Sequence, residues 1–284
     1  MLTMKHTYTG PRHNLTFKIM SNADTEDKVR SVEVYATPEE IAQLDTEGYI
    51  VRDTLFAGES LEQLRTALDE VEAAERTETS ISTSRRFGGM FLRHLFDKHP
   101  IFLGLIKFPP TLSVARAVFG PLVNIRQLGA RISYPGEPNQ ETHWHLHRRV
   151  IPNPIPAFYT YPHTLDCLIY LDELNDATGP ISIVPGTHKR IHDELPADDY
   201  DDKPGQLTFH LPAGSCLIFH SNVWHRASPT TAAGTKRRCL MLCYGPTWMR
   251  RSPFGEKPKN GLTDELLKTA DKETKELLGI GGYQ

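Results

Sequence analysis

Three histidines have the residue type and the spacing of a metal site. His145 and His147 flank a single residue, and His225 lies far along the chain in a Trp-His pair like the one that contains His145. If residues 145–147 form a strand, alternation puts the first two side chains on one face, roughly 6–7 Å apart at Cα. His225 ends an apolar run, residues 214–225, of the kind found in buried strands. Because imidazole suits iron, zinc, copper and nickel alike, the spacing predicts a metal centre without choosing the metal.

The surrounding sequence resembles the phytanoyl-CoA dioxygenase family of Fe(II)/2-oxoglutarate oxygenases over about residues 38–250. Four segments are similar to the family's proximal metal motif, its Pro-Gly-Ser/Thr-His stretch, its distal ligand segment and the strand that carries its 2-oxoglutarate arginine. They comprise residues 134–136 with 141–147, 171–189, 212–225 and 236–240. The resemblance implies a double-stranded β-helix (a cupin-like jelly roll), with Fe(II) held at its open mouth by His145, His147 and His225.

One position departs from the family pattern: the family has aspartate where this chain has His147. A neutral imidazole in place of a carboxylate leaves the ion one unit more positive and changes its redox potential. Three outcomes are open. They are a working three-histidine site, a site that recruits a nearby carboxylate such as Glu141, or a fold that has lost its metal. We favour the first, because the two other histidines and the arginine-rich segment are kept together.

The resemblance also implies a reaction. Fe(II) and O2 would decarboxylate 2-oxoglutarate to succinate while an unactivated C–H bond of a small molecule is oxidised, with hydroxylation as the default. One alternative is a three-histidine iron dioxygenase that does not use 2-oxoglutarate. Another is a metal-free binding protein on the same fold. The sequence does not identify the substrate, the kind of oxidation or the oligomeric state.

The distal carboxylate of 2-oxoglutarate needs a fixed cation, and arginine binds carboxylates in bidentate form. Family spacing points to Arg237 as this anchor, with Lys236 and Arg238 as rivals. Alternation along a strand makes Arg237 and Arg238 face opposite ways, so only one can reach the site. Gln127 matches a second position where the family contacts 2-oxoglutarate, although it could equally be a buried strand residue.

Composition is compatible with this interpretation. The net charge of −3 shows no excess of positive charge for nucleic acid. The four cysteines lie in apolar runs without a zinc-type Cys-x-x-Cys pair, which indicates reduced thiols and a cytoplasmic location. No apolar stretch approaches the roughly 18 residues of a membrane span, and the N-terminus lacks a signal-peptide core. We therefore expect a cytoplasmic enzyme whose partners are its substrate, 2-oxoglutarate and O2.

A single domain is expected over residues 1–284, because β-barrels and sandwiches of this size often form one domain. Short apolar strands between Pro/Gly turns predict a β core, so the fold class is mostly β with flanking helices. The divisions we expect are an N-terminal extension, a helical buttress, the β core and a C-terminal helix. They span residues 1–36, 37–121, 122–248 and 249–284.

Local signals predict several elements within these divisions. Thr37-Pro38 with Glu40 predicts a capped helix that ends near Gly48, and residues 49–51 a strand. Further helices are expected from Ser60, with Gln63 completing a capping box, and over 111–119 and 263–279. Residues 15–20 and 124–133 are strand candidates. Trp144 and Trp224 should pack the barrel wall, and the proline-rich segment 148–163 should form an ordered loop over the mouth.

Overall fold

Two antiparallel sheets dominate the computed structural model, which describes residues 4–18, 29–77, 81–82, 88–147, 154–156, 164–249 and 260–281. A seven-stranded sheet has the order β3-β10-β7-β12-β6-β5-β4, and a three-stranded sheet has the order β11-β8-β9. The strands of the large sheet are β3 Tyr49–Arg52, β4 Ile81–Ser82, β5 Gly89–Leu92, β6 Val123–Ser133, β7 Leu165–Tyr170, β10 Cys216–His220 and β12 Arg237–Pro246. The small sheet contains β8 Ile181–Val184, β9 Leu207–Phe209 and β11 Trp224–Ala227.

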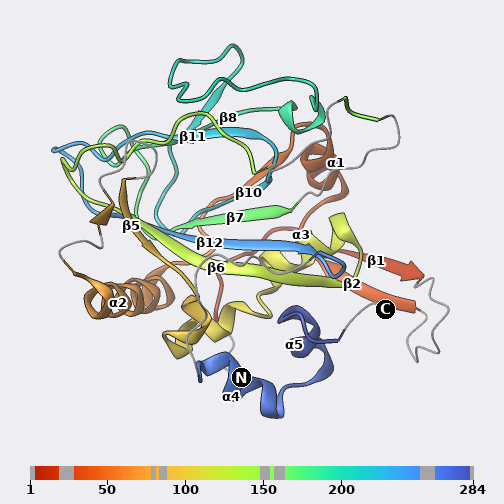
Figure 1. The fold of residues 1–284 in the computed structure, drawn as a ribbon. Helices are drawn as coiled ribbons and strands as arrows, with labels where there is room; N and C mark the ends of the chain where they lie inside the picture. The colour runs from red at the N-terminus through yellow and green to blue at the C-terminus, as the bar shows by residue number, and fades with distance from the viewer. Residues whose placement is uncertain are drawn as a thin grey trace.

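The remaining described elements surround these sheets. A separate hairpin pairs β1 His13–Lys18 with β2 Val29–Val34. The α-helices are α1 Pro38–Thr46, α2 Gly58–Glu75, α3 Pro109–Phe119, α4 Leu262–Thr269 and α5 Lys272–Leu277, and short 3-10 helices span Leu95–Asp97, Pro100–Leu105 and Thr187–Lys189. Figure 1 shows the large sheet between the small sheet and a layer that contains α2, α4 and α5. The mostly β jelly-roll fold with flanking helices is confirmed, and its sheets do not close into a barrel.

Strand alternation divides the interior into two cores. On β7, Cys167 and Ile169 face the helices, together with Leu242 of β12, and belong to the main hydrophobic core. The intervening Leu168 and Tyr170 face the small sheet, where they pack in a second core that includes residues of β8 and β10. We call the side of the large sheet that faces the small sheet its inner face. Polar residues on the inner face lie between the two sheets, where a site could form.

The first helix and the strand after it form as expected. The Thr37 side chain accepts a hydrogen bond from the backbone N–H of Glu40, and the Glu40 carboxylate accepts one from the backbone N–H of Thr37. Pro38 occupies the first turn, where its missing N–H is not needed. The chain leaves α1 through Gly48, whose φ of +88° favours glycine, and enters β3. The capping box predicted for α1 is therefore confirmed.

Two other helix predictions need correction. Helix α2 begins at Gly58, with Ala57 as its N-cap and no side-chain cap, so Ser60 and Gln63 do not form the predicted capping box. The Ser60 hydroxyl instead donates to the Ala57 carbonyl. The single C-terminal helix expected over 263–279 is two helices, α4 and α5, because Asp271 caps a new start by accepting from the backbone N–H of Thr274. The α3 prediction is confirmed.

Further sequence expectations have mixed outcomes. All four cysteines are buried and free, as expected. No helix in the described part of the chain has the length and apolarity needed to cross a membrane. The β1–β2 hairpin adds a second strand to the one anticipated near residue 15. The loop predicted over 148–163 lies outside the described residues, except for 154–156.

Candidate metal centre

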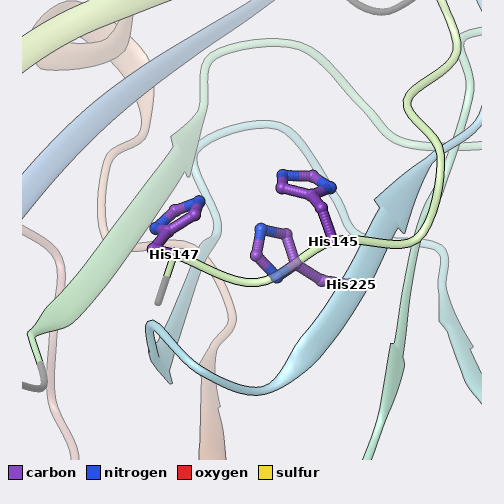
Figure 2. Close-up of side chains that lie close together, drawn as sticks. All are labelled: His145, His147 and His225. Carbon is purple, nitrogen blue, oxygen red and sulfur yellow. The ribbon is translucent and has the colours of Figure 1, made fainter. Parts of the chain in front are cut away.

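The three predicted histidines lie together at one edge of the small sheet. One ring nitrogen from each of His145, His147 and His225 can be chosen so that all three atoms lie within 4.8 Å of one another. The ring centroids of His145 and His225 are 4.1 Å apart, and those of His147 and His225 are 4.9 Å apart. Figure 2 shows the rings gathered, with His225 coming from β11 and the other two from one loop. The arrangement could hold one metal ion.

The local backbone differs from the prediction, since residues 145–147 do not form a strand. His145 makes a single isolated antiparallel bridge with His225, through two backbone hydrogen bonds of 3.0 Å. The N–H of His147 then donates to the carbonyl of Ser221, in the turn before β11. These contacts hold the segment along β11 without continuing a ladder. The expected same-side placement of His145 and His147 nevertheless occurs, with ring centroids 5.6 Å apart.

Each ring has an acceptor at its Nδ1 atom. The Nδ1 of His145 lies 2.9 Å from the carbonyl oxygen of His143, and that of His225 lies 2.8 Å from the carbonyl oxygen of Val223. The Nδ1 of His147 lies 2.9 Å from a carboxylate oxygen of Asp166. Because these acceptors carry no hydrogen, each Nδ1 must donate, and each Nε2 then carries a lone pair. Such outer partners are the usual way of orienting metal-binding imidazoles.

Burial keeps two of the rings neutral. It lowers the pKa of His145 well below its usual range, with a further contribution from the nearby His225 and His147. Burial also lowers the pKa of His225 to about 3. Both imidazoles are therefore uncharged at neutral pH and can offer their lone pairs to a cation.

Asp166 was not among the predicted site residues. It lies on the inner face of β7 and is only 6% exposed. Burial acts to raise the pKa of its carboxyl group, but the electrostatic interaction and the hydrogen bond with His147 outweigh this effect, and the pKa is lowered. The residue is therefore a buried carboxylate anion. Its signal in the sequence was an aspartate within the otherwise apolar strand LDCLIY.

No carboxylate joins the three histidines as a potential ligand within the described residues. Glu141, the carboxylate that seemed nearest in sequence, is not brought into the group. Asp166 instead accepts a hydrogen bond from Nδ1 of His147 and is not directed at the point between the three rings. The potential ligand set in the described chain is therefore three imidazoles.

The three neighbouring cations at the start of β12, residues 236–238, have different surroundings. Lys236 pairs with Asp69 and Glu72 of α2, and Arg238 pairs with Asp69 and with Asp172. Their charges are thus used to fasten β12 to α2 on the side of the sheet that faces the helices. The predicted rivals for 2-oxoglutarate are both engaged in this way.

Arg237 points to the opposite side and is buried, with 4% of its surface exposed. Its guanidinium donates to the carbonyl oxygens of Gly179 and Ser228 and to the Ser133 hydroxyl. A second inner-face arginine, Arg131, donates to two backbone carbonyls, and its Nε has no hydrogen-bond partner among the described residues. Burial and the nearby Arg237 lower the pKa of Arg131 to about 9. Neither arginine forms an ion pair with a carboxylate of the described residues, which makes this region suited to an anion.

Gln127 also faces the small sheet, at a different place. Cross-strand register aligns Asp166 with Cys243 and Cys243 with Gln127, so all three side chains share the inner face. Arg237 pairs with Ser133, six residues farther along β6. The backbones of Gln127 and Arg237 are therefore roughly 20 Å apart. Gln127 lies at the end of the sheet occupied by the histidines, and the structure does not bring it to the anchor region.

The two tryptophans beside the histidines pack as expected. Trp144 and Trp224 are buried with Val184 in a small cluster on the far side of the β8–β11 sheet. The Trp144 indole N–H donates to the carbonyl of Asp201. Alternation explains this placement, because each tryptophan precedes a histidine that faces the opposite way.

The fold and the three-histidine cluster indicate a protein with a non-haem metal centre between its two sheets. Comparison with known families specifies it further. The chain belongs to the phytanoyl-CoA dioxygenase (PhyH) family, which it matches over residues 44–239. It is therefore a non-haem iron, 2-oxoglutarate-dependent dioxygenase, with Fe(II) as its metal and 2-oxoglutarate as its cosubstrate.

Curated relatives agree with this assignment. The chain is 23% identical over 235 residues to ectoine dioxygenase of Bordetella parapertussis, an alignment that covers 72% of this chain and 74% of the relative. It is 22% identical over 233 residues to L-proline trans-4-hydroxylase of Streptomyces griseoviridis, covering 69% and 81% respectively.

Solved structures share the fold. The α-ketoglutarate-dependent carbocyclase SnoK of nogalamycin biosynthesis superposes with a TM-score of 0.61 at 18% identity, covering 83% of this chain and 91% of that one. HygX of Streptomyces hygroscopicus, with nickel and 2-oxoglutarate bound, superposes with a TM-score of 0.60 at 16% identity, covering 76% and 89%.

Proposed function

We propose that His145, His147 and His225 bind Fe(II), and that the enzyme oxidises an unactivated C–H bond of a small molecule at the expense of 2-oxoglutarate. One observation carries the proposal. Three imidazoles converge within 4.8 Å while each Nδ1 is held by an acceptor. This arrangement presents three Nε2 lone pairs to one ion and leaves the ion's remaining positions for other ligands. The donor set therefore fits iron.

When bound, Fe(II) supplies the chemistry that couples O2 and 2-oxoglutarate decarboxylation to oxidation of the substrate. The protein residues bind the ion and orient the rings that hold it. The carbonyls of His143 and Val223 fix two of the rings, and Asp166 fixes the third. Because the tautomers are set in advance, the rings need no reorganisation when the metal enters.

Arg237 is the proposed anchor for the distal carboxylate of 2-oxoglutarate. Its guanidinium donates a hydrogen bond to the carbonyl of Ser228. Ser228 comes three residues after His225, and three residues of extended chain span about 10 Å. A five-carbon dicarboxylate with a metal bond at one end and a charge-assisted hydrogen bond at the other covers roughly this distance. Arg131 adds a second positive charge to the anchor region. The ion pairs of Lys236 and Arg238 with α2 argue against this role for either of them.

Gln127 is a proposed contact at the metal end of 2-oxoglutarate. It lies on the inner face in line with Asp166, whose carboxylate holds His147. A side-chain amide there offers both donors and an acceptor to the metal-chelating keto acid.

Hydroxylation of a small molecule is the proposed reaction, with O2 as the oxidant. The names of the relatives support this choice, since one is a proline hydroxylase and another an ectoine dioxygenase. The four buried free cysteines support a cytoplasmic location, where thiols stay reduced. A dioxygenase that ignores 2-oxoglutarate is the second candidate. Arg131 and Arg237 argue against it, because they are buried and form no ion pair within the part of the chain that the structure describes, and such an enzyme would not need this cationic region.

The test is succinate formation by the Fe(II)-reconstituted protein, with O2 and 2-oxoglutarate, in the presence of a panel of amino acids and other small molecules. We expect slow succinate release without substrate and stimulated release with the right one. The His225→Ala variant should release none. Consumption of O2 with oxidised product but no succinate would overturn the proposal in favour of the second candidate.

A further inference from the structure

The family has a metal-binding aspartate where this chain has His147, and a carboxylate, that of Asp166, is hydrogen-bonded to this histidine. We propose that Asp166 supplies, through His147, the negative charge that a ligand aspartate would give to the ion. Asp166 is then a positioning residue that acts on the metal through an imidazole. This inference rests on the proposed function, because it requires His147 to bind the metal.

The three histidines differ in what lies behind them. His145 and His225 donate to backbone carbonyls, which are neutral acceptors. Only His147, which replaces the family's aspartate, donates to a carboxylate. The charged partner is therefore found at the one position where the chain lacks the expected ligand charge.

The charge of Asp166 has no lysine or arginine partner among the described residues. The residue is 6% exposed and lies in a strand whose other residues are apolar apart from Cys167 and Tyr170. Its only ion-pair partner among the described residues is His147, and no lysine or arginine of that part of the chain reaches it. A buried carboxylate is costly unless a positive charge is nearby. A metal ion on the far nitrogen of His147 would provide that charge.

The charge count of the site supports this role. Fe(II) with two histidines and an aspartate carries one net positive charge, whereas Fe(II) with three neutral histidines carries two. Counting the negative charge of Asp166 brings the three-histidine site back to one net positive charge. Hydrogen bonding to a carboxylate also makes the imidazole a stronger donor to the metal. The stabilisation should be larger for Fe(III) than for Fe(II), because the ion's charge is higher.

The test compares Asp166→Asn in two backgrounds, the natural protein and His147→Asp. Asparagine keeps the shape and an acceptor oxygen but removes the charge. In the natural background we expect Fe(II) to bind about 10- to 100-fold more weakly, measured by anaerobic calorimetry, and the Fe(III)/Fe(II) potential to rise. In the His147→Asp background the ligand charge is already present and Asp166 would repel it. There the same substitution should leave Fe(II) affinity unchanged or strengthen it.

Asp172→Asn is the matched control. It removes a partly buried carboxylate that pairs with Arg238 on the helix-facing side of β12, so Fe(II) affinity should stay within twofold of the natural protein. Equal losses of affinity on Asp166→Asn in both backgrounds would overturn the inference and indicate a structural role. No loss in the natural background would also overturn it while leaving iron binding intact. If the natural protein binds no Fe(II), the proposed function fails first, and this inference with it.

Discussion

Arg237 and Arg238 are adjacent on β12 and face opposite sides of the sheet, which provides a matched pair of substitutions. Arg237 is buried and pairs with no carboxylate of the described chain, whereas Arg238 is paired with Asp69 and Asp172. A hydrogen bond to a charged group contributes about 1.5–3 kcal/mol. Arg237→Ala should therefore weaken 2-oxoglutarate binding by roughly 10- to 100-fold. Arg238→Ala should leave that affinity unchanged and lower the stability of the protein instead.

Anaerobic calorimetry with the Fe(II)-loaded variants measures both affinities, and urea unfolding measures the stability. Equal affinities for 2-oxoglutarate in the two variants would show that Arg237 is not the anchor.

Gln127 should have a smaller effect than Arg237, because a neutral hydrogen bond contributes about 0.5–1.5 kcal/mol. We expect Gln127→Ala to weaken 2-oxoglutarate binding roughly 2- to 10-fold, measured in the same titration. A change of 2-oxoglutarate affinity as large as that of Arg237→Ala, or none, would contradict its placement at the metal end.

The three histidines could be predicted to lie together from their spacing in the sequence. Arg237 was indicated only by the resemblance to the family, and its role remains a proposal. Asp166 could not be linked to His147, since the hydrogen bond that joins them depends on how β7 packs beside the 145–147 loop. Arg131 was overlooked for a similar reason. For Asp166 the available signal was a charged residue within an otherwise apolar strand, which indicates that the strand faces a polar site. The strand of Arg131 contains several other polar residues and gives no such signal.

Helix α1 allows a test at the level of elements. The Thr37 side chain accepts from the backbone N–H of Glu40, far from the histidines in sequence and on a different element. Thr37→Ala should lower the free energy of unfolding by about 1 kcal/mol, measured by urea denaturation of the apoprotein. Fe(II) affinity should not change. Thr37→Ser keeps the acceptor and serves as the control; a loss of stability as large in this variant would contradict the capping role.

Elements with strong local signals were predicted well. A capping box and a proline specified α1, and apolar runs between turns specified β3 and β6. The single strand expected over residues 214–225 is instead two strands, β10 and β11, which belong to different sheets. Tertiary contacts decided the rest. Helix α2 begins before Ser60 without a side-chain cap. The 145–147 segment, although its alternation is correct, pairs with β11 through only one bridge, so no strand forms.

At the scale of the whole molecule, metal binding should be linked to stability. A ligand that binds only the folded state at 100 times its dissociation constant stabilises it by about 2.7 kcal/mol. For a chain of this size we expect Fe(II) to raise the melting temperature by roughly 5–10 °C, measured anaerobically by calorimetry, and a chelator to reverse the change. The melting temperature of the His145→Ala variant should change with neither Fe(II) nor the chelator. An iron-dependent shift of equal size in that variant would place the metal elsewhere.

We also expect a single unfolding transition, because residues 1–284 are proposed to form one domain. Leu277 and Leu278 at the C-terminal end lie in the same hydrophobic core as Val32 and Val34 of the N-terminal hairpin. Contacts between the two ends of the chain within one core favour cooperative unfolding.

The central claim is that three histidines hold an iron that 2-oxoglutarate chelates. The most direct measurement is an anaerobic titration of the apoprotein with Fe(II) and then 2-oxoglutarate, following the weak visible metal-to-ligand band of a chelated keto acid. The account predicts this band at one iron per chain, its absence in His225→Ala and a changed band energy in His147→Ala. Iron binding without the band would contradict 2-oxoglutarate chelation. An unchanged band in His147→Ala would contradict the three-histidine site, and absence of iron binding would contradict the catalytic account as a whole.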